Sequence, residues 1–526
     1  MEIVDRVRQI LATRGLTLYQ VSQRSAEVFG ESSLYFIPQR LYHELGIGAL
    51  NPNIHQFAAL SRISNYRISD WLAAFGFRLD DIPRLQLLIP WRRTVLLDSS
   101  VYDLEQEIPW FDDKAGELER PALAPLGQFL IPSAPKRAKD LLALNKRKFL
   151  YAKIGYEDTF AFPTLLPGSV ARINVQYSPE LGNSLELTNC KRIFLVQHGL
   201  ALNCGYLTSI DNARFALTST HFPFRRVELT LGDTVKILGL VDAELRPIVV
   251  KPGTEISRGK SGNRAGSDPM PRSSSLDLRQ LIRTSRMGVG VSFRQASTIT
   301  RWIARTLNDP MYFAAAGTLS DYEKVSSPLR HVQKLISLCI LYCIDFWTFL
   351  RSAGIPTEFL GNDPLPDELI PRPLLPSAAD FGNESRSGKK EAALLSWLIE
   401  QWEELPLFMK SGLPAISGLK DISITDIFWL GASEDPMHPA LTGASLLVVN
   451  RRIKIPVKST APTVWEQPLY VVLLRGGSYL CCSCELRGGI LIANPHSQRP
   501  QRSIKLRNGI DAEVVGQVTA ILRRLS

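Results

Sequence analysis

The chain has 526 residues, of which 45% are hydrophobic and 21% charged, so its composition is that of a globular protein with buried cores. At roughly 100–200 residues per domain, this length predicts about three to five domains. The net charge of +10 mildly favours a polyanionic partner over an acidic substrate. The seven cysteines are too scattered for a disulfide framework and indicate a reducing compartment.

The N-terminal segment, MEIVDRVRQILATRG, carries charge from residue 2 onward and has no apolar signal region. The sequence contains no run of about 18 apolar residues. The closest stretch, 335–350, is interrupted by Asp345 and has the spacing of a buried helix. We therefore expect a soluble cytoplasmic protein with no membrane partner.

The chain repeats itself at the scale of domains. Three pairs of segments have helical spacing and share an aliphatic-Arg-Gln start, a Tyr-Phe pair or a terminal Gly: 7–22 with 278–297, 33–45 with 310–323, and 64–76 with 341–354. The terminal Gly suits a helix C′ position in the left-handed conformation. These pairs predict a helical domain that occurs twice.

Two helix starts have the same cap chemistry. Thr17 with Gln20, and Ser292 with Gln295, have the spacing of a capping box. In such a box the hydroxyl accepts a hydrogen bond from the third helical amide, and the Gln side chain reaches back to the amide of the cap. We therefore expect one helix to begin after Thr17 and another after Ser292.

Short β-branched stretches punctuated by Gly and Pro follow each helical part. Three pairs of them match: 155–174 with 431–450, 192–207 with 468–486, and 232–241 with 510–522. They predict a small, mostly-β module that also occurs twice. The expected fold class is α+β, with two helical domains alternating with two β modules.

The patterns also divide the chain into segments, and a Gly-, Ser- and Pro-rich stretch without periodicity reads as a flexible linker. The expected order is a helical domain (1–90), a connector (91–150), a β module (151–251), the flexible linker (252–275), a second helical domain (276–356), a connector with a helix (357–420) and a second β module (421–526). The chain would then be one two-domain unit written twice.

The helical domains resemble the Cro/XRE type of helix-turn-helix domain. In the second copy, LRQLIRTSR resembles the first helix, SFRQAS opens the second helix, and GTLSDYEK resembles the recognition helix. Both copies carry about ten residues where that family has a short turn, and Pro38 stands in the first recognition stretch. The resemblance implies that a recognition helix enters the major groove of double-stranded DNA.

The resemblance also implies where DNA would be contacted, at the start of the second helix and along the recognition helix. Gln and Arg suit the edges of adenine and guanine, Tyr and Ser suit phosphates, and Asp321 weakens phosphate attraction. The contact residues are Tyr19, Gln20, Gln39, Arg40, Tyr42 and His43 in the first copy, and Arg294, Gln295, Thr318, Ser320, Asp321 and Tyr322 in the second. The alternative is that one or both helical domains are packing modules that contact other parts of the protein and not DNA.

The β modules resemble the C-terminal module of LexA-type and phage-type repressors. That module opens with a Ser-Met-x-Pro-x-Leu-x-x-Gly loop and ends with an Ile-Gly-x-Val strand. EDTFAFPTLLPG (157–168) and EDPMHPALTGA (434–444) keep the Pro, Leu and Gly, and KILGLV and EVVGQV match the end. These repressors also place a helix-turn-helix domain before the β module.

Repressors of this type cleave themselves with a Ser nucleophile in the loop and a buried Lys base. The nucleophile position falls on Phe160 in the first copy and Pro436 in the second, and neither side chain can attack a carbonyl. The strands that should carry the base, within 199–209 and 477–487, contain no Lys. We therefore expect no catalytic residue and no enzyme, the alternative being a self-cleaving repressor with altered catalytic residues.

Cys481, Cys482 and Cys484 do not have the spacing of a structural zinc site, which repeats a pair of ligands. On a strand, Cys481 faces opposite to the other two, and all three read as small residues of a β core. His438 has no partner carboxylate outside its own loop and reads as a turn residue. No metal and no cofactor is expected.

Together these features predict a sequence-specific DNA-binding transcriptional regulator that acts as a single-chain pseudo-dimer without autoproteolysis. Its partners would be double-stranded DNA and, through the β modules, itself. Two non-identical readers in one chain suit an asymmetric site with half-sites about one helical turn apart. The other alternative is a protein-interaction scaffold built from degenerate repressor domains.

Overall fold

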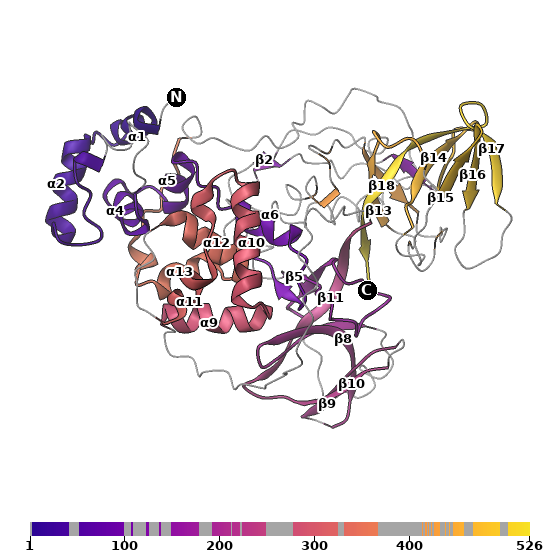
Figure 1. Cartoon of the computed structure of the whole chain (residues 1–526), viewed down its shortest axis with the longest axis horizontal. Helices are drawn as coiled ribbons and strands as arrows, with labels where there is room; N and C mark the ends of the chain where they lie inside the picture. Colours follow the sequence, from indigo (N-terminus) through magenta and orange to yellow (C-terminus); the bar gives the residue numbers. More distant parts are fainter. Residues whose placement is uncertain are drawn as a thin grey trace.

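A computed structural model describes residues 3–41, 52–98, 107–108, 123–125, 136–137, 149–177, 192–211, 213–220, 224–248, 277–324, 331–366, 426–431, 445–456, 467–494 and 503–525, with single residues between 413 and 441. Helices and antiparallel strands are both present, so the fold is a mixed α+β fold, as expected. The helices lie together on one side and the larger sheet on the other (Figure 1). None of the described helices is long and apolar enough to cross a membrane.

The described helices of the first half are α1 (Ile3–Ala12), α2 (Leu18–Phe29), α4 (Ile54–Ser64), α5 (Ile68–Ala74) and α6 (Asp81–Leu88). The expected capping box begins α2: the Thr17 hydroxyl accepts from the Gln20 amide at 3.2 Å, and the Gln20 side chain accepts from the Thr17 amide at 2.8 Å. Gly76 follows the end of α5 with a φ of 89°, the left-handed conformation predicted for it.

The second half contains α9 (Leu278–Val289), α10 (Phe293–Thr306), α11 (Ala316–Lys324), α12 (Val332–Tyr342) and α13 (Phe346–Ser352), with single turns η2 (Pro310–Tyr312) and η3 (Thr357–Phe359). Ser292 and Gln295 form the second predicted capping box. Gly354, after α13, has the predicted left-handed φ, at 78°. Residues 307–315, including η2, connect α10 to α11, so this pair does not have the short turn of the resembled family.

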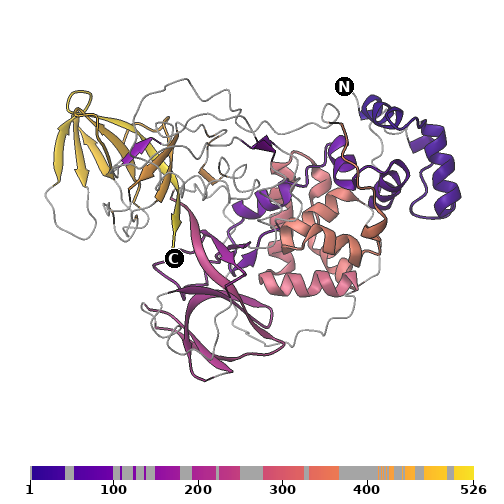
Figure 2. The same ribbon diagram turned by 180° about the vertical axis from the view of Figure 1, so that it is seen from behind.

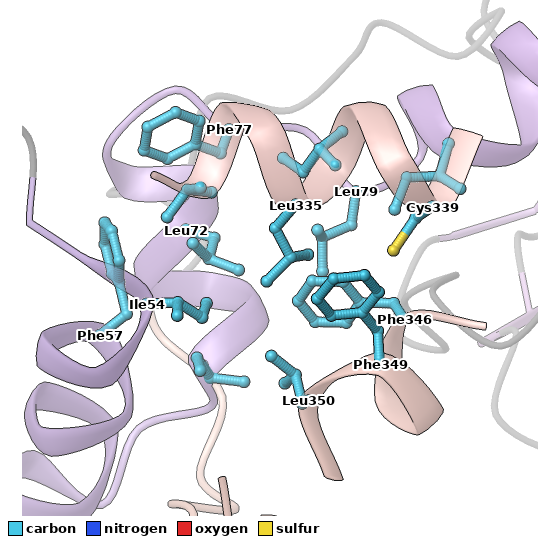
Figure 3. Packing of buried hydrophobic residues seen from close by; sticks show 14 of the residues in the cluster. Ile54, Phe57, Leu72, Phe77, Leu79, Leu335, Cys339, Phe346, Phe349 and Leu350 are labelled. Atoms are coloured by element: carbon cyan, nitrogen blue, oxygen red, sulfur yellow. The ribbon is translucent and has the colours of Figure 1, made fainter. Parts of the chain in front are cut away.

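Helices from both halves share one hydrophobic core. Figure 3 shows Leu72 and Leu79 of the first half close to Leu335, Phe346 and Phe349 of the second. A polar contact adds to the apolar ones, because the Gln86 side chain of α6 donates to the Cys339 carbonyl of α12 at 3.1 Å. Burial of this apolar surface holds the two helical sets together.

The segment after α13 returns to the helices of the first half. The Asp363 amide donates to the Asn65 carbonyl, and the Arg67 amide donates to the Asp363 carbonyl, each at 3.0 Å. A Cβ added at Gly361 would lie 2.3 Å from the Asn65 carbonyl carbon, so only glycine fits at this crossing. Two residues inside the predicted connector 357–420 therefore pack on the first helical set.

The strands of the first β module are β5 (Phe149–Lys153), β6 (Val170–Asn174), β7 (Ile193–His198), β8 (Ala201–Ser209), β9 (Arg214–Thr218), β10 (Arg226–Thr230) and β11 (Val235–Pro247), with β1 (Val95–Leu96) added from the preceding segment. Each strand is antiparallel to its neighbours, in the order β1-β5-β6-β11-β7-β8-β9-β10.

The second set comprises β12 (Ile427–Leu430), β13 (Ser445–Asn450), β14 (Tyr470–Leu474), β15 (Tyr479–Arg487), β16 (Ile490–Asn494), β17 (Ile504–Arg507) and β18 (Ala512–Arg524), with β3 (Leu123–Pro125) at its edge. Its order is β3-β12-β13-β18-β14-β15-β16-β17, again all antiparallel, which is the same pattern of pairing as in the first set. A separate two-stranded sheet pairs β2 (Glu107–Ile108) with β4 (Lys136–Arg137).

A glycine interrupts the long last strand of each set, at Gly239 in β11 and Gly516 in β18. The pairing register shifts beside both glycines, as at a β-bulge. A Cβ added at Gly239 would lie 2.3 Å from the Asn174 carbonyl oxygen, and one at Gly516 would lie 2.5 Å from that of Asn450. The close approach of a neighbouring strand therefore explains the glycine in both KILGLV and EVVGQV.

The long strands β11 and β18 also pair with each other, so that the two sets form one continuous sheet. In both views these two strands lie where the two groups of strands meet (Figures 1 and 2). The junction is antiparallel, with Leu245 opposite Leu522.

Candidate functional site

The position that the resemblance assigns to the first nucleophile is part of the core. Phe160 is only 7% exposed and packs with Phe194, Phe215 and Leu217. A Cβ added at Gly205 of β8 would come within 2.8 Å of the Phe160 Cβ, so Phe160 lies close to β8 at a position where only glycine fits. The apolar side chain therefore fills this position. The second position, Pro436, and His438 lie outside the described residues.

A buried carboxyl group, Asp158, lies in the same loop. One of its oxygens accepts hydrogen bonds from the Thr94 hydroxyl at 2.5 Å and from the Cys204 amide at 2.9 Å. Burial raises the pKa of Asp158 to about 6, against the opposing effect of these hydrogen bonds. Burial and the nearby Asp158 also raise the pKa of the Cys204 thiol, so this thiol stays protonated and is a weak nucleophile.

A buried lysine, Lys153, lies on β5, outside the segment 199–209 in which the resemblance predicts the base. Its ammonium donates to the Gly168 carbonyl, and it makes no ion pair within the described part of the chain. Burial lowers the pKa of Lys153 to about 8. A buried lysine could serve as a base, but the structure brings it to a backbone carbonyl and not to a hydroxyl nucleophile.

The three clustered cysteines line two separate cores, as the alternation of a strand predicts. Cys481 packs with Phe428 and Val471, whereas Cys482 and Cys484 lie in a second cluster. The sulfur atoms of Cys482 and Cys484 are 3.3 Å apart, and this hydrogen bond together with burial raises the pKa of Cys482. Burial raises the pKa of Cys481. Within the described ranges, no group of three or more His, Cys, Asp or Glu side chains is placed to hold a metal ion.

The predicted DNA-contact residues of the first copy are exposed where the structure describes them. Tyr19 is 62% exposed, and Gln20, Gln39 and Arg40 are also exposed. The side-chain oxygen of Gln20 is occupied by the capping box, which leaves its amide group to reach outward. Tyr42 and His43 lie outside the described residues.

The predicted recognition helix of the second copy, α11, presents few groups to solvent. Thr318, Ser320 and Tyr322 are half-buried, and burial raises the pKa of the Tyr322 hydroxyl. Asp321 is exposed, and the acidic Glu323 is bound by Arg286 at 2.5 Å. The exposed charges of α11, Asp321 and Lys324, are opposite in sign, so the helix surface offers a phosphate little net attraction.

The preceding helix, α10, carries a row of basic side chains. Arg294, Arg301 and Arg305 are exposed on one face, and Gln295 is half-buried at its start. The opposite face packs Ala296, Ile299, Thr300, Ile303 and Ala304 into the core. The spacing of i, i+7 and i+11 places the three arginines along roughly 16 Å of one helix face.

The arginines of α10 have no acidic partner among the residues that the structure describes. No ion pair of Arg294, Arg301 or Arg305 is present among the described residues, and the Arg301 guanidinium lies 5.1 Å from the centre of the Phe313 ring. Only Arg294 is among the predicted DNA-contact residues, although the helical spacing of all three arginines can be seen in FRQASTITRWIART. Counted from the caps, Tyr19, Ala26 and Gly30 occupy these positions on the first copy.

Comparison with known proteins gives no assignment, since the chain matches no family model, no curated protein and no solved structure.

Proposed function

We propose that the chain is a sequence-specific DNA-binding transcriptional regulator, and that in its second half α10 presents the surface that contacts the DNA backbone. The row of Arg294, Arg301 and Arg305 carries this proposal. Guanidinium groups make charge-assisted hydrogen bonds to phosphates, and double-stranded DNA offers about five phosphates per strand along 16 Å of its axis. The described residues form no ion pair with these arginines, so no ion pair within the described part of the chain opposes their contact with DNA.

The architecture supports a single-chain pseudo-dimer related to LexA-type repressors. Both halves begin their second helix with a capping box, and both sets of strands pair in the same order. The bulge glycines Gly239 and Gly516 stand at matching points of β11 and β18. These likenesses favour an internal duplication, in which two non-identical readers are held by one continuous sheet.

Salt-dependent DNA binding tests the proposal. Duplexes selected from a random pool are titrated with the full chain and with Arg294→Ala/Arg301→Ala/Arg305→Ala. Loss of three phosphate contacts reduces the magnitude of the negative slope of log K against log salt by about 2.7 and weakens binding. The matched control, Arg225→Ala/Arg452→Ala/Lys505→Ala, removes the same charge from exposed sites of the β modules and leaves the slope unchanged.

The outcomes separate the candidate functions. A pool without enrichment at moderate salt rejects DNA binding and favours an interaction scaffold. Equal slopes for the α10 variant and the wild type would place the contacts on another helix and reject the role of α10.

Regulation without self-cleavage is the second part of the proposal, and the buried, apolar Phe160 supports it. Incubation at pH 10 deprotonates any lysine base and accelerates cleavage of the repressor type. The intact mass is expected to stay that of the full chain. Two fragments whose masses add up to that of the full chain would instead support the self-cleaving alternative.

A further inference from the structure

We infer that buried charged side chains at the junction between β11 and β18 select the partner strand. They favour pairing of β11 with β18 and disfavour pairing of β18 with the β18 of a second chain. The surface concerned is the pair of strand edges that joins the two β modules. This inference rests on the pseudo-dimer arrangement proposed above, and it is independent of DNA binding.

The register gives the junction a local two-fold axis. Leu245 lies six residues after the bulge glycine Gly239 (245 − 239 = 6), and Leu522 lies six residues after Gly516 (522 − 516 = 6). These two equivalent leucines are paired directly in the antiparallel ladder. An axis through their midpoint therefore exchanges β11 with β18.

The side chains beside the axis break this symmetry. Glu244 is opposite Arg523, and Arg246 is opposite Ile521. Under the two-fold axis Arg246 corresponds to Arg523, but Glu244 corresponds to Ile521. One carboxylate therefore serves two arginines, and only β11 supplies that carboxylate.

The three charged side chains form a buried cluster. Glu244 has no exposed surface, and the side chains of Arg246 and Arg523 are 5% and 6% exposed. One Glu244 oxygen accepts from Arg246 at 2.8 Å and from Arg523 at 2.7 Å, and the other accepts from the Leu166 amide at 3.1 Å. Arg523 also donates to the Thr164 carbonyl, so the loop of the first module closes over the cluster.

The cluster discriminates between strand pairings. A β18–β18 junction between two chains would bury two copies of Arg523 beside Ile521 and supply no carboxylate. Removing the partner of a buried charge is strongly destabilising, because the remaining charge is left uncompensated. A β11–β11 junction balances its own charges but leaves two β18 edges that must pair without Glu244. Arg523 of β18 therefore finds a carboxylate only when β18 pairs with a β11. The β11 of the same chain is the favoured partner, because covalent linkage keeps it at high effective concentration.

Disulfide trapping tests which strands pair. Directly opposite residues of an antiparallel ladder have Cα atoms about 4.5–5.5 Å apart, within reach of a disulfide. Under mild oxidation with oxidised glutathione, Leu245→Cys/Leu522→Cys is expected to form an intrachain bond, seen as faster migration without reductant and mapped by peptide mass. Each single variant, and an equimolar mixture of the two, is expected to stay monomeric.

The trapped species decide the matter. Covalent dimers of either single variant would show that two like strands pair between chains. A covalent dimer that forms in the mixture, but not with either variant alone, would show that β11 of one chain pairs with β18 of another. Either result overturns pairing within one chain, as does failure of the double variant to close. These readouts need no DNA, so loss of the DNA-binding proposal leaves them intact.

A second variant tests whether the charged cluster selects the partner strand. Glu244→Met/Arg246→Met/Arg523→Met replaces the cluster by apolar side chains, a kind of change that buried ionic clusters tolerate. On this background, Leu522→Cys is expected to give at least several-fold more covalent dimer than on the charged background, increasing with protein concentration. An equal yield of covalent dimer on both backgrounds would mean that covalent linkage alone selects the partner strand. It would overturn the inference that the charged cluster does so.

Discussion

The two halves of the molecule begin their second helices with the same cap and then expose different faces. Thr17 and Ser292 occupy the same role, because the first amides of any helix need acceptors. Beyond the cap, α10 exposes a row of arginines, whereas α2 exposes Tyr19 and a Gln23–Glu27 hydrogen bond. Both helices need a cap for their first backbone amides, whereas the side chains on their solvent-exposed faces can differ and serve different functions.

The two groups of strands differ in the same manner inside their cores. Lys153 pairs with Val170 in the first group, and Trp429 stands at the matching register, opposite Leu446, in the second. Both are buried, but one carries an amine and the other an indole. Asp158 and Glu244 are also buried in the first group, so among the described residues the buried carboxyl and amine side chains of the two groups lie in the first.

The largest effect is expected where the halves are most alike, at the bulge glycines. Gly239→Ala forces a Cβ against the Asn174 carbonyl and must also adopt a φ of 154°, so it should lower the free energy of unfolding by about 3–5 kcal/mol. Gly516→Ala meets a similar contact without a positive φ and should cost about 1 kcal/mol less. Urea unfolding followed by circular dichroism measures both, and equal costs would contradict the role of φ.

Replacing Lys153 by an apolar residue should make this core position of the first half resemble the matching position of the second, where Trp429 is buried. Because the pKa of Lys153 falls from 10.5 to about 8 on folding, the folded state holds fewer protons than the unfolded state between these values. The destabilisation is full below pH 8 and disappears as the pH approaches 10.5. Lys153→Met should therefore add about 3 kcal/mol at pH 7 and much less near pH 10.

The exposed Lys236 provides the matched control for that measurement. Lys236→Met should change the free energy of unfolding by less than about 0.5 kcal/mol at either pH. A Lys153→Met variant that is less stable than the wild type at pH 7 would show that the bond to Gly168 outweighs the burial of the charge.

A third test concerns the buried acid of the first half. The folded-state pKa of Asp158, about 6, lies above its ordinary 3.8, so folding takes up a proton in this window and stability falls as the pH rises from 4 to 6. Asp158→Asn should remove about 2–3 kcal/mol of this decline. The exposed Asp233→Asn should keep the profile of the wild type, and an unchanged profile in Asp158→Asn would refute the assignment.

The smallest expected effect transfers a basic side chain from one half to the other. Tyr19 occupies the position of Arg294 counted from the cap, so Tyr19→Arg should add one phosphate contact if both halves lie on DNA. The negative slope of log K against log salt should then become steeper by about 0.9, with a few-fold gain in affinity at low salt. Tyr19→Gln is the uncharged control, and an unchanged slope in Tyr19→Arg would remove α2 from the DNA-facing surface.

The sequence by itself determined the features that obey local rules. The capping boxes, the left-handed glycines Gly76 and Gly354, and the opposite orientation of Cys481 and Cys482 all follow from spacings of one to three residues. The α+β class follows from the two periodicities. Each depends only on the backbone geometry of one helix or strand.

Only the tertiary structure decided how distant segments meet. Gln86 reaches Cys339, and Glu244 is shared by Arg246 and Arg523, because the chain folds back to bury apolar faces and pair strand edges that lie far apart in sequence. A periodic pattern says which face of an element is buried but not which partner covers it. The burial of Lys153, the core position of Phe160 and the junction of β11 with β18 all depended on that choice of partner.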